Sequence, residues 1–465
     1  MTHYGMTTGR VLAKLCECPE HVPSHLDVIA GAARPMGHID NNSLDRCIHH
    51  HAGAMQVRRV YHAAESLMHE GTRCECFDDT EKALGMDRVV ALDIPTSARA
   101  ADLAHDLNER DDVEWAMPEP MSFAPMDITP VRVLSARDMT PEKILAPFQQ
   151  VGAFVALEME PGDPAIRVAV VDTGVALGHP EFHNRIAAGV DTVDLGNGAL
   201  GGGAELVGDS DTPDIMAHDE TGHGSHVAGI IAANGDRIPP GVGGRACLIP
   251  VRALAAARSA DGRIVGIGGT MDIDAAVKAA VDLGARVLNL SFGTSEEDMP
   301  FGAPPVHSDT IQYVLAKGAV PVAAMGNSGK SERFYPAALD GVIAVGAINE
   351  HGRRASFSTM GDHIALSAPG EDVISTGLTG YRASTGTSHA APFVAGAVAL
   401  MLARGDAAGL RLNAIQCRDI LRRAADPAHP DSRPEETGAG RLNVPRTLSL
   451  VDQLIAANQG GSNGR

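Results

Sequence analysis

The pattern of apolar and polar positions along this 465-residue chain changes near residue 141. Beyond that point, short β-branched runs alternate with stretches of helical periodicity. The runs lie at 167–171, 286–290, 320–324 and 342–345, and helical stretches lie at 273–283 and 309–316. This alternation is typical of a mostly parallel sheet with helices on both faces. We therefore expect an α/β domain with three layers over residues 141–455.

A different pattern precedes it. Residues 56–121 predict a small α+β domain of ferredoxin-like layout, with a helix between the second and third of three strands at 56–61, 88–94 and 113–116. Residues 1–55, rich in Cys and His, are expected to be a separate N-terminal extension. The segment 122–140 contains Pro125 and Pro130 and predicts a linker, and the Gly/Ser/Asn-rich end at 456–465 predicts a flexible tail.

Composition narrows the classes of partner and compartment. The formal charge is −20, with 58 acidic against 38 basic residues, which argues against a nucleic-acid or anionic-membrane partner because each needs a basic face. No unbroken run of 18 or more apolar residues predicts a membrane span. The first 19 residues lack the apolar core and cleavage site of a signal peptide, so we expect a cytoplasmic protein.

The seven cysteines are unevenly placed, with five of them in the first 76 residues. An odd number without a secretory signal fits a reducing compartment better than a disulfide framework. Cys247 and Cys417 lie in apolar surroundings and are expected to be buried thiols. A zinc site is a weakly supported alternative for the N-terminal cysteines and histidines, because Cys-x-Cys is a weak spacing: Cys16, Cys18, Cys47, Cys74, Cys76 and His49 to His51.

Three segments carry residue types suited to nucleophilic catalysis. An apolar strand ends in Asp172, at the edge of a parallel sheet where ligands and catalytic groups collect. His223 lies between two glycines at the start of an apolar helix, which we expect to leave its ring accessible. Ser388 begins a long apolar helix, where backbone N–H groups point toward whatever the serine attacks.

Each segment alone permits another interpretation. Asp-Thr-Gly also marks aspartic peptidases, which need two such aspartates, or it is an aspartate that caps a turn. His218, His223 and His226 are near enough in sequence for zinc, but no His-Glu-x-x-His arrangement supports it. Ser388 alone is more commonly an N-cap. Together the three segments favour a Ser-His-Asp triad.

The order Asp172, His223, Ser388 is that of subtilisin and differs from the orders in chymotrypsin and α/β-hydrolases. The blocks around these residues resemble those around the triad of subtilases, at 168–174, 223–229 and 386–396. The resemblance covers about residues 141–450 and includes a closing motif at 438–443. It implies a subtilisin-like fold and a serine endopeptidase that requires no cofactor.

The resemblance also implies roles for other residues. The block 323–329 resembles the segment that carries the oxyanion asparagine of the family, which implies this role for Asn327. The implied substrate-binding residues lie in this block and in 287–293: Ser291, Phe292, Gly293, Ala324, Met325 and Gly326. Phe292, Met325 and His389 depart from the usual residues of the family, so its cleavage preference is not carried over.

The segment 191–220 is an insertion before the catalytic histidine. It is either a substrate-gating loop or a surface excursion. Its acidic residues are candidate calcium ligands without a fixed spacing, and no obligatory metal is predicted: Asp209, Asp211, Asp214 and Asp219.

The layout of residues 56–121 is similar to that of a subtilase propeptide, which lays its last segment through the active cleft. This similarity implies a zymogen cleaved between about residues 121 and 140. The alternative is a permanently attached accessory domain. We therefore expect a selective intracellular processing peptidase that acts on a protein or peptide. A peptide ligase or transferase using the same acyl-enzyme, and a non-catalytic peptide-binding homologue, are the alternatives.

Overall fold

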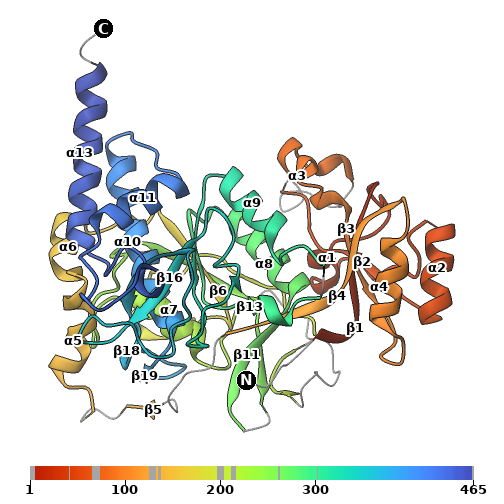
Figure 1. The fold of residues 1–465 in the computed structure, drawn as a ribbon, viewed down its shortest axis with the longest axis horizontal. Coiled ribbons are helices and arrows are strands. Elements are labelled where there is room, and N and C mark those ends of the chain that lie inside the picture. The colour runs from red at the N-terminus through yellow and green to blue at the C-terminus, as the bar shows by residue number, and fades with distance from the viewer. Residues whose placement is uncertain are drawn as a thin grey trace.

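The computed structural model describes residues 6–40, 42–64, 74–124, 132–134, 138–195, 204–210, 216–259, 262–300 and 302–462. They form a large α/β domain beside a smaller N-terminal α+β domain (Figure 1). The fold class predicted from the sequence is confirmed.

A seven-stranded parallel sheet with the order β17-β16-β14-β12-β6-β9-β7 forms the centre of the large domain. Its strands are β6 (Arg167–Asp172), β7 (Val190–Asp191), β9 (Cys247–Arg252), β12 (Val287–Leu290), β14 (Val320–Ala324), β16 (Ile343–Ile348) and β17 (Ile364–Pro369). The side chains of these strands are buried on both faces of the sheet, which explains their nearly continuous apolar sequence.

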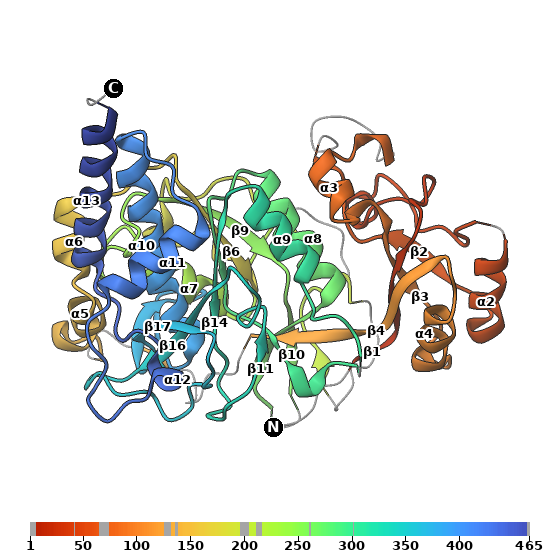
Figure 2. The same cartoon turned by 45° about the horizontal axis from the view of Figure 1, so that its top comes forward.

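Helices cover both faces of this sheet (Figures 1 and 2). One face carries α5 (Pro141–Gln150), α6 (Ala153–Met159), α7 (His223–Ala232), α10 (Thr387–Ala407), α11 (Ala414–Ala424) and α13 (Val444–Ser462). The other face carries α8 (Thr270–Asp282) and α9 (Ser308–Ala316), which lie between the sheet and the N-terminal domain. The short α12 (Pro434–Thr437) contacts β16 and β17.

Helix α10 is long and apolar enough to cross a membrane by length and composition alone. The sequence-based expectation, which looked for an unbroken apolar run, missed it. Because 83% of its most apolar window is buried inside the protein, and because it packs on β12, β14, β16 and β17, it is the core helix of the large domain.

The N-terminal domain has the sheet order β2-β3-β1-β4, with antiparallel neighbours. Its elements are β1 (Met6–Leu15), α1 (His25–Ile29), α2 (Ser43–Ala52), β2 (Gln56–Arg59), α3 (Asp79–Ala83), β3 (Val89–Asp93), α4 (Ala100–Asn108) and β4 (Val113–Phe123). The predicted separate extension at 1–55 is therefore wrong, because β1 is an inner strand of this sheet. Its partners Leu92 and Pro118 are far along the chain, so no local signal reveals the pairing.

Strand β4 connects the two domains. The strand predicted at 113–116 continues to Phe123, and its end pairs with β11 (Ile264–Gly269) of the large domain. β11 pairs in turn with β10 (Ala255–Arg258), and β10 with β8 (Glu205–Leu206), so one sheet runs through both domains (Figure 2). The predicted linker 122–140 therefore begins inside a strand.

The chain after β4 contains a further strand. β5 (Arg132–Val133) pairs with β19 (Tyr381–Ser384), which pairs with β18 (Val373–Thr376). A two-stranded sheet joins β13 (Thr294–Ser295) to β15 (Phe334–Tyr335). The other residues of the predicted linker, at 125–131 and 135–137, lie outside the described part of the chain.

The predicted flexible tail at 456–465 is also corrected. Helix α13 continues to Ser462, and residues 463–465 lie outside the described residues. The buried side chains of Leu448 and Val451 attach the earlier part of this helix to the core, and the helix extends beyond them.

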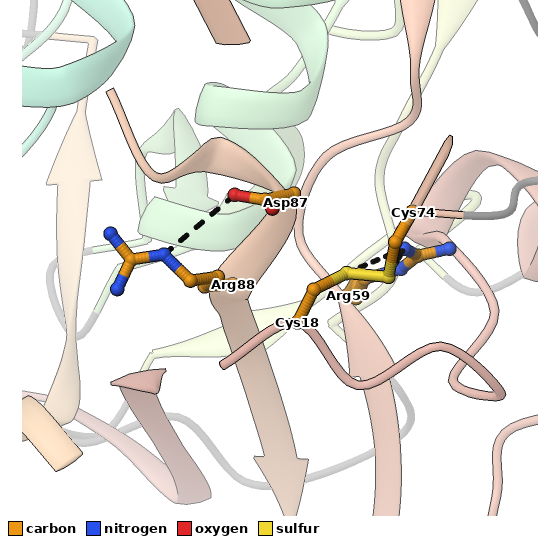
Figure 3. The surroundings of a disulfide bond; sticks show 5 residues. All are labelled: Cys18, Arg59, Cys74, Asp87 and Arg88. Carbon is orange, nitrogen blue, oxygen red and sulfur yellow. Dashed lines mark hydrogen bonds and ion pairs between the residues drawn. A yellow bond between two sulfur atoms is a disulfide. The ribbon is translucent and has the colours of Figure 1, made fainter. Parts of the chain in front are cut away.

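Cys18 and Cys74 form a disulfide across a sequence separation of 56 (Figure 3). The guanidinium of the buried Arg59 lies against it, with Nη1 3.6 Å from Sγ of Cys18 and 3.5 Å from Sγ of Cys74. The preference for a chain without disulfides is therefore wrong for this pair. The bond also uses two of the thiols considered for zinc.

The other cysteines follow the expectation in part. Cys417 is buried, as predicted, whereas Cys247 is partly exposed. Within the described ranges, no group of three or more His, Cys, Asp or Glu side chains is placed to hold a metal ion. The independence from metals and cofactors stays a prediction.

Candidate active site

Asp172 and His223 meet where strand β6 ends and helix α7 begins. Oδ1 of the buried Asp172 accepts a hydrogen bond from Nδ1 of His223 at 2.7 Å and another from the backbone N–H of Thr173 at 2.7 Å. The bond to Nδ1 fixes the orientation of the imidazole and makes Nε2 the nitrogen that can act as a base. The predicted pair is therefore brought together.

Two glycines allow helix α7 to approach β6 this closely. A Cβ on Gly224 would lie 2.1 Å from the carbonyl oxygen of Gly174 and 3.1 Å from Cβ of Asp172. Gly222, with φ +82°, turns the chain into the helix in a conformation that L-residues rarely adopt. The sequence-based interpretation was that these glycines expose the ring. Instead they allow close packing, and His223 is only 6% exposed.

Asp219 holds the turn that leads into α7, and sequence reasoning missed this role. Its Oδ1 accepts hydrogen bonds from the N–H groups of Thr221 and Gly222, both at 2.9 Å, and from the hydroxyl of Thr173 at 2.8 Å. Its Oδ2 accepts from the N–H (2.9 Å) and hydroxyl (2.6 Å) of Ser225. A carboxylate at a helix N-terminus satisfies N–H groups that have no partner within the helix.

The sequence offered a signal for this role, because Asp219 lies just before the first residue of α7. The prediction weighed it as a calcium ligand with Asp209, Asp211 and Asp214. Of these, Asp209 donates its backbone N–H to the Glu220 carboxylate, at 3.0 and 3.1 Å, and Asp211 and Asp214 lie outside the described residues.

Ser388 lies in the first turn of helix α10 and is buried. Its hydroxyl donates to the carbonyl oxygen of Ser291 at 3.3 Å, and the hydroxyl of Ser291 donates to the carbonyl oxygen of Ser388 at 2.9 Å. Ser291 follows strand β12, so these two bonds tie the start of α10 to the end of that strand. Catalytic hydrogen bonds are often completed only when a substrate binds.

Asn327 is held by the residue before Ser388. Its Oδ1 accepts hydrogen bonds from both the N–H and the hydroxyl of Thr387, each at 2.9 Å. With the amide oxygen fixed, Nδ2 is the donor end, and it lies 2.9 Å from the position of a Cβ on Gly386. Thr387 is thus a second residue that sequence reasoning did not assign, although it stands in the motif beside Ser388.

His389 packs between two other histidine rings. Its ring centroid lies 5.4 Å from that of His223 and 4.4 Å from that of His226. Nε2 of His226 is in turn hydrogen-bonded to the carbonyl oxygen of Val373 at 2.9 Å. His389 therefore supports the ring of His223 from the side, a contact that its place in the sequence did not reveal.

The residues predicted to bind substrate occupy different environments. Gly293 exchanges both backbone hydrogen bonds with Phe123 at the end of β4, at 2.9 and 3.0 Å. The N–H of Gly326, whose φ is +92°, donates to the hydroxyl of Thr387 at 3.2 Å. The side chains that complete the set are fully buried: Ala324, Met325 and Phe292. Their effect on cleavage preference stays a prediction.

The sequence model described as "Subtilase family" matches residues 163–440, which include the three triad residues and Asn327. The chain belongs to the subtilase family. The N-terminal domain and β4 lie before the matched region.

Similar curated proteins are named as proteases. The chain is 36% identical over 277 residues to "Thermophilic serine proteinase" of Bacillus sp. (strain AK1), a match that covers 58% of this chain and 59% of that protein. It is 32% identical over 277 residues to "Thermitase" of Thermoactinomyces vulgaris, which covers 59% of this chain and 85% of thermitase. The chain thus matches about three fifths of the length of the Bacillus proteinase.

A solved structure supports the fold. The structure titled "Crystal Structure of a Lanthipeptide Protease" matches with a TM-score of 0.53 and 21% identity, covering 66% of this chain and 95% of that one. At this identity the match supports the arrangement of the subtilase domain and nothing about substrates.

Proposed function

We propose that this protein is a serine endopeptidase that cleaves protein or peptide substrates through an acyl-enzyme on Ser388. The observation that carries the proposal is the hydrogen bond between Asp172 and Nδ1 of His223, formed in the same site as Ser388 and Asn327. The family membership and the named proteases among its relatives support it.

The chemistry follows from these positions. On substrate binding the hydroxyl of Ser388 turns from the carbonyl of Ser291 to Nε2 of His223, which accepts its proton as Oγ attacks the substrate carbonyl carbon. Asp172 stabilises the resulting imidazolium. His223 then delivers the proton to the leaving amine, and the same base activates the water that hydrolyses the ester.

Negative charge develops on the substrate carbonyl oxygen in each step. Nδ2 of Asn327 and the N–H of Ser388 are the donors that meet this charge, at the positive end of the dipole of helix α10. Because Thr387 holds the other end of the Asn327 amide, the donor is oriented before the substrate arrives.

A fluorophosphonate probe tests this proposal. We expect it to label wild-type protein and the control variant Ser308→Ala, whose serine is bonded to the carbonyl of Pro305, but not Ser388→Ala. Peptide cleavage should follow the same pattern. Equal labelling of Ser388→Ala would contradict the assignment. Product analysis with an added amine distinguishes hydrolysis from peptide transfer, because a ligase would form the new amide.

The second part of the proposal is that the N-terminal domain inhibits the enzyme within one chain. The end of β4 lies between β11 and Gly293, with the N–H of Ala124 donating to the carbonyl oxygen of Gly266 at 3.0 Å. Further along the chain, β5 pairs with β19. Arg382 of β19 donates a hydrogen bond at 2.9 Å to the carbonyl oxygen of Thr221, which lies two residues before His223. Described segments before and after residues 125–131 thus flank the site.

Buried ion pairs attach this domain to the enzyme. The fully buried Lys278 of α8 pairs with Glu81 of the N-terminal domain at 2.6 Å and with Asp282 at 2.7 Å. Apolar side chains of both domains, such as Tyr61 and Tyr313, are buried in one cluster, and burial of apolar surface stabilises this contact. We therefore expect the domain to stay docked after a cut between about residues 121 and 140.

Intact-mass analysis of wild-type protein and Ser388→Ala tests this zymogen hypothesis. We expect wild-type protein in two fragments that elute together in gel filtration, and Ser388→Ala at full length. If both proteins stay at full length, self-processing is wrong and the N-terminal domain is a permanent accessory.

The proposal also includes a selective role in processing particular proteins or peptides. It is supported by the end of β4, which occupies the groove between β11 and Gly293. The sequence predicts a cytoplasmic location. The Cys18–Cys74 disulfide favours an oxidising compartment instead, because such bonds persist mainly there. Cell fractionation with thiol alkylation decides between them: a reduced pair in the cytosolic fraction supports the cytoplasm.

A further inference from the structure

Ser122, near the end of β4, inserts its hydroxyl into a polar pocket of the large domain. Its Oγ lies 2.8 Å from Oγ1 of Thr294 on β13 and 3.3 Å from Nε2 of His307, the residue before α9. The side chain of Ser122 is 0% exposed, and Thr294 and His307 are also buried. The side chain of the neighbouring β4 residue Met121 packs among apolar side chains, and its backbone carbonyl oxygen accepts a hydrogen bond from the Thr294 hydroxyl at 3.1 Å, so Ser122 supplies the side-chain hydroxyl of this contact.

A buried carboxylate fixes how this pocket presents its polar atoms. Oδ1 of Asp274 on α8 lies 2.7 Å from Nδ1 of His307. The carboxylate accepts a hydrogen bond from Nδ1–H of His307. Nε2 is then the ring nitrogen that accepts a hydrogen bond from the Ser122 hydroxyl. The edge of His307 packs against Phe292, with ring centroids 5.9 Å apart, which holds the imidazole in place.

The backbone register places this pocket along the path of a substrate. Ser122 pairs with Gly268, Phe123 pairs with both Ile267 and Gly293, and the next residue donates to the carbonyl of Gly266. A peptide that adds a strand in the same groove takes the same ladder. Along that ladder, a substrate residue two positions after the partner of Gly293 lies opposite Ser291, which is bonded to Ser388.

That substrate residue presents the carbonyl attacked by Ser388, so it immediately precedes the cut bond. The residue in the place of Ser122 is three positions earlier. It is therefore the fourth residue before the cut.

We propose that Asp274, Thr294 and His307 form a hydroxyl-selective pocket that favours serine or threonine as the fourth residue before the cut. The inference rests on the proposed peptidase function and names its substrate class. An apolar side chain there would leave Nε2 of His307 without its hydrogen-bonding partner in a buried site, and Thr294 would keep only its bond to the backbone carbonyl oxygen of Met121, at 3.1 Å. Buried polar groups left in this way are penalised strongly, which is how a binding site rejects an analogue that lacks one hydroxyl.

Peptides that differ only at this position test the proposal, with threonine and valine as an isosteric pair. For the wild-type protein as it is purified, we expect kcat/KM at least about 10-fold higher for threonine or serine than for valine. Thr294→Val should reduce that preference several-fold. The control Thr447→Val alters a buried threonine of α13, whose hydroxyl donates to the carbonyl oxygen of Asn443, and should not change the preference. Equal kcat/KM for threonine and valine peptides would overturn the proposal.

A second measurement needs no catalysis. In the full-length Ser388→Ala protein, Ser122→Thr and Ser122→Val place side chains of the same shape in the pocket. We expect faster hydrogen exchange of the backbone amides at the end of β4 in Ser122→Val than in Ser122→Thr, by about 10-fold.

Equal exchange in the two variants would refute the hydroxyl pocket even if no peptide is cleaved. Absence of cleavage of every peptide, together with absence of fluorophosphonate labelling, would instead refute the proposed peptidase function. The two failures are therefore distinguishable.

Discussion

The substitution Thr387→Val examines how the oxyanion donor is held. Thr387 gives Asn327 two hydrogen bonds of 2.9 Å, one from its N–H and one from its hydroxyl. Valine has nearly the same shape as threonine but removes the hydroxyl, while the backbone N–H stays. The Thr387 hydroxyl also accepts a hydrogen bond from the N–H of Gly326 at 3.2 Å, so Thr387→Val leaves the Gly326 N–H without this partner.

The expected effect is smaller than the loss of Asn327 itself. In subtilisin, removing the oxyanion asparagine costs about 10²–10³ in kcat. Losing one hydrogen bond that orients the amide should weaken the interaction by about 1–1.5 kcal/mol, which corresponds to about 5–10-fold in kcat. KM should change little, because the donor acts on charge that develops in the transition state.

Steady-state kinetics on one peptide substrate measure this effect. Thr387→Ser keeps a hydroxyl and should retain most of the activity. In an Asn327→Leu background the further change Thr387→Val should have almost no effect, because both residues act through one amide. Independent, additive losses in the double variant would refute the reasoning and would show that the Thr387 hydroxyl acts by another route, such as its bond to Gly326.

Three further predictions follow from the packing and charges. Gly224→Ala must displace α7 from β6, since its Cβ would lie 2.1 Å from a carbonyl oxygen. This change should lower kcat/KM by about 10² or more. Gly178→Ala is the control, because open space surrounds Gly178, and it should not change kcat/KM. Burial, followed by the charge of Arg58, lowers the pKa of His25 to about 3. The unfolded chain therefore binds a proton below pH 6.5 that the folded protein does not, so stability should fall by up to about 1.4 kcal/mol per pH unit between pH 6.5 and 3. Melting temperatures at pH 7 and 5 should differ less in His25→Gln than in wild-type protein, and an equal difference would contradict the assignment. Replacing Cys18 and Cys74 by serine removes the constraint on a loop of 56 residues, which is worth roughly 4 kcal/mol in the chain-entropy model. The urea midpoint of the N-terminal domain should therefore fall, and an unchanged midpoint would contradict this prediction.

The sequence predicted the parallel sheet and the pairing of Asp172 with His223 because these features carry local signals. Each strand of the sheet is a short apolar run, Asp172 ends one of these runs, and His223 and Ser388 lie at helix starts. The resemblance to subtilases adds Asn327, and the structure shows its amide held by Thr387. Local pattern and family resemblance were thus sufficient to predict the main elements of the site.

What the sequence did not predict depends on contacts between distant segments. The sequence predicts residues 1–55 to be a separate Cys/His-rich extension, because the partners of β1, which are β3 and β4, lie far along the chain. The end of β4 falls in the segment 122–140, which the sequence predicts to be a linker because of Pro125 and Pro130, yet this end pairs with β11. His307 and Asp274 belong to different elements, and their pairing gains a role only because β4 brings Ser122 to the other ring nitrogen of His307.

The pairing of β4 with both β1 of the N-terminal domain and β11 of the large domain has a consequence for regulation. A tethered segment competes with free peptide at an effective concentration on the order of millimolar, which equals or exceeds typical values of KM. A substrate at lower concentration therefore does not displace the end of β4 while the chain is intact. A cut after β4 leaves that strand held by β1 and by the buried pair of Lys278 with Glu81. Only the last residues of the strand, from Ser122 onward, then need to leave the groove, so the substrate gains the hydroxyl pocket without displacing the whole N-terminal domain.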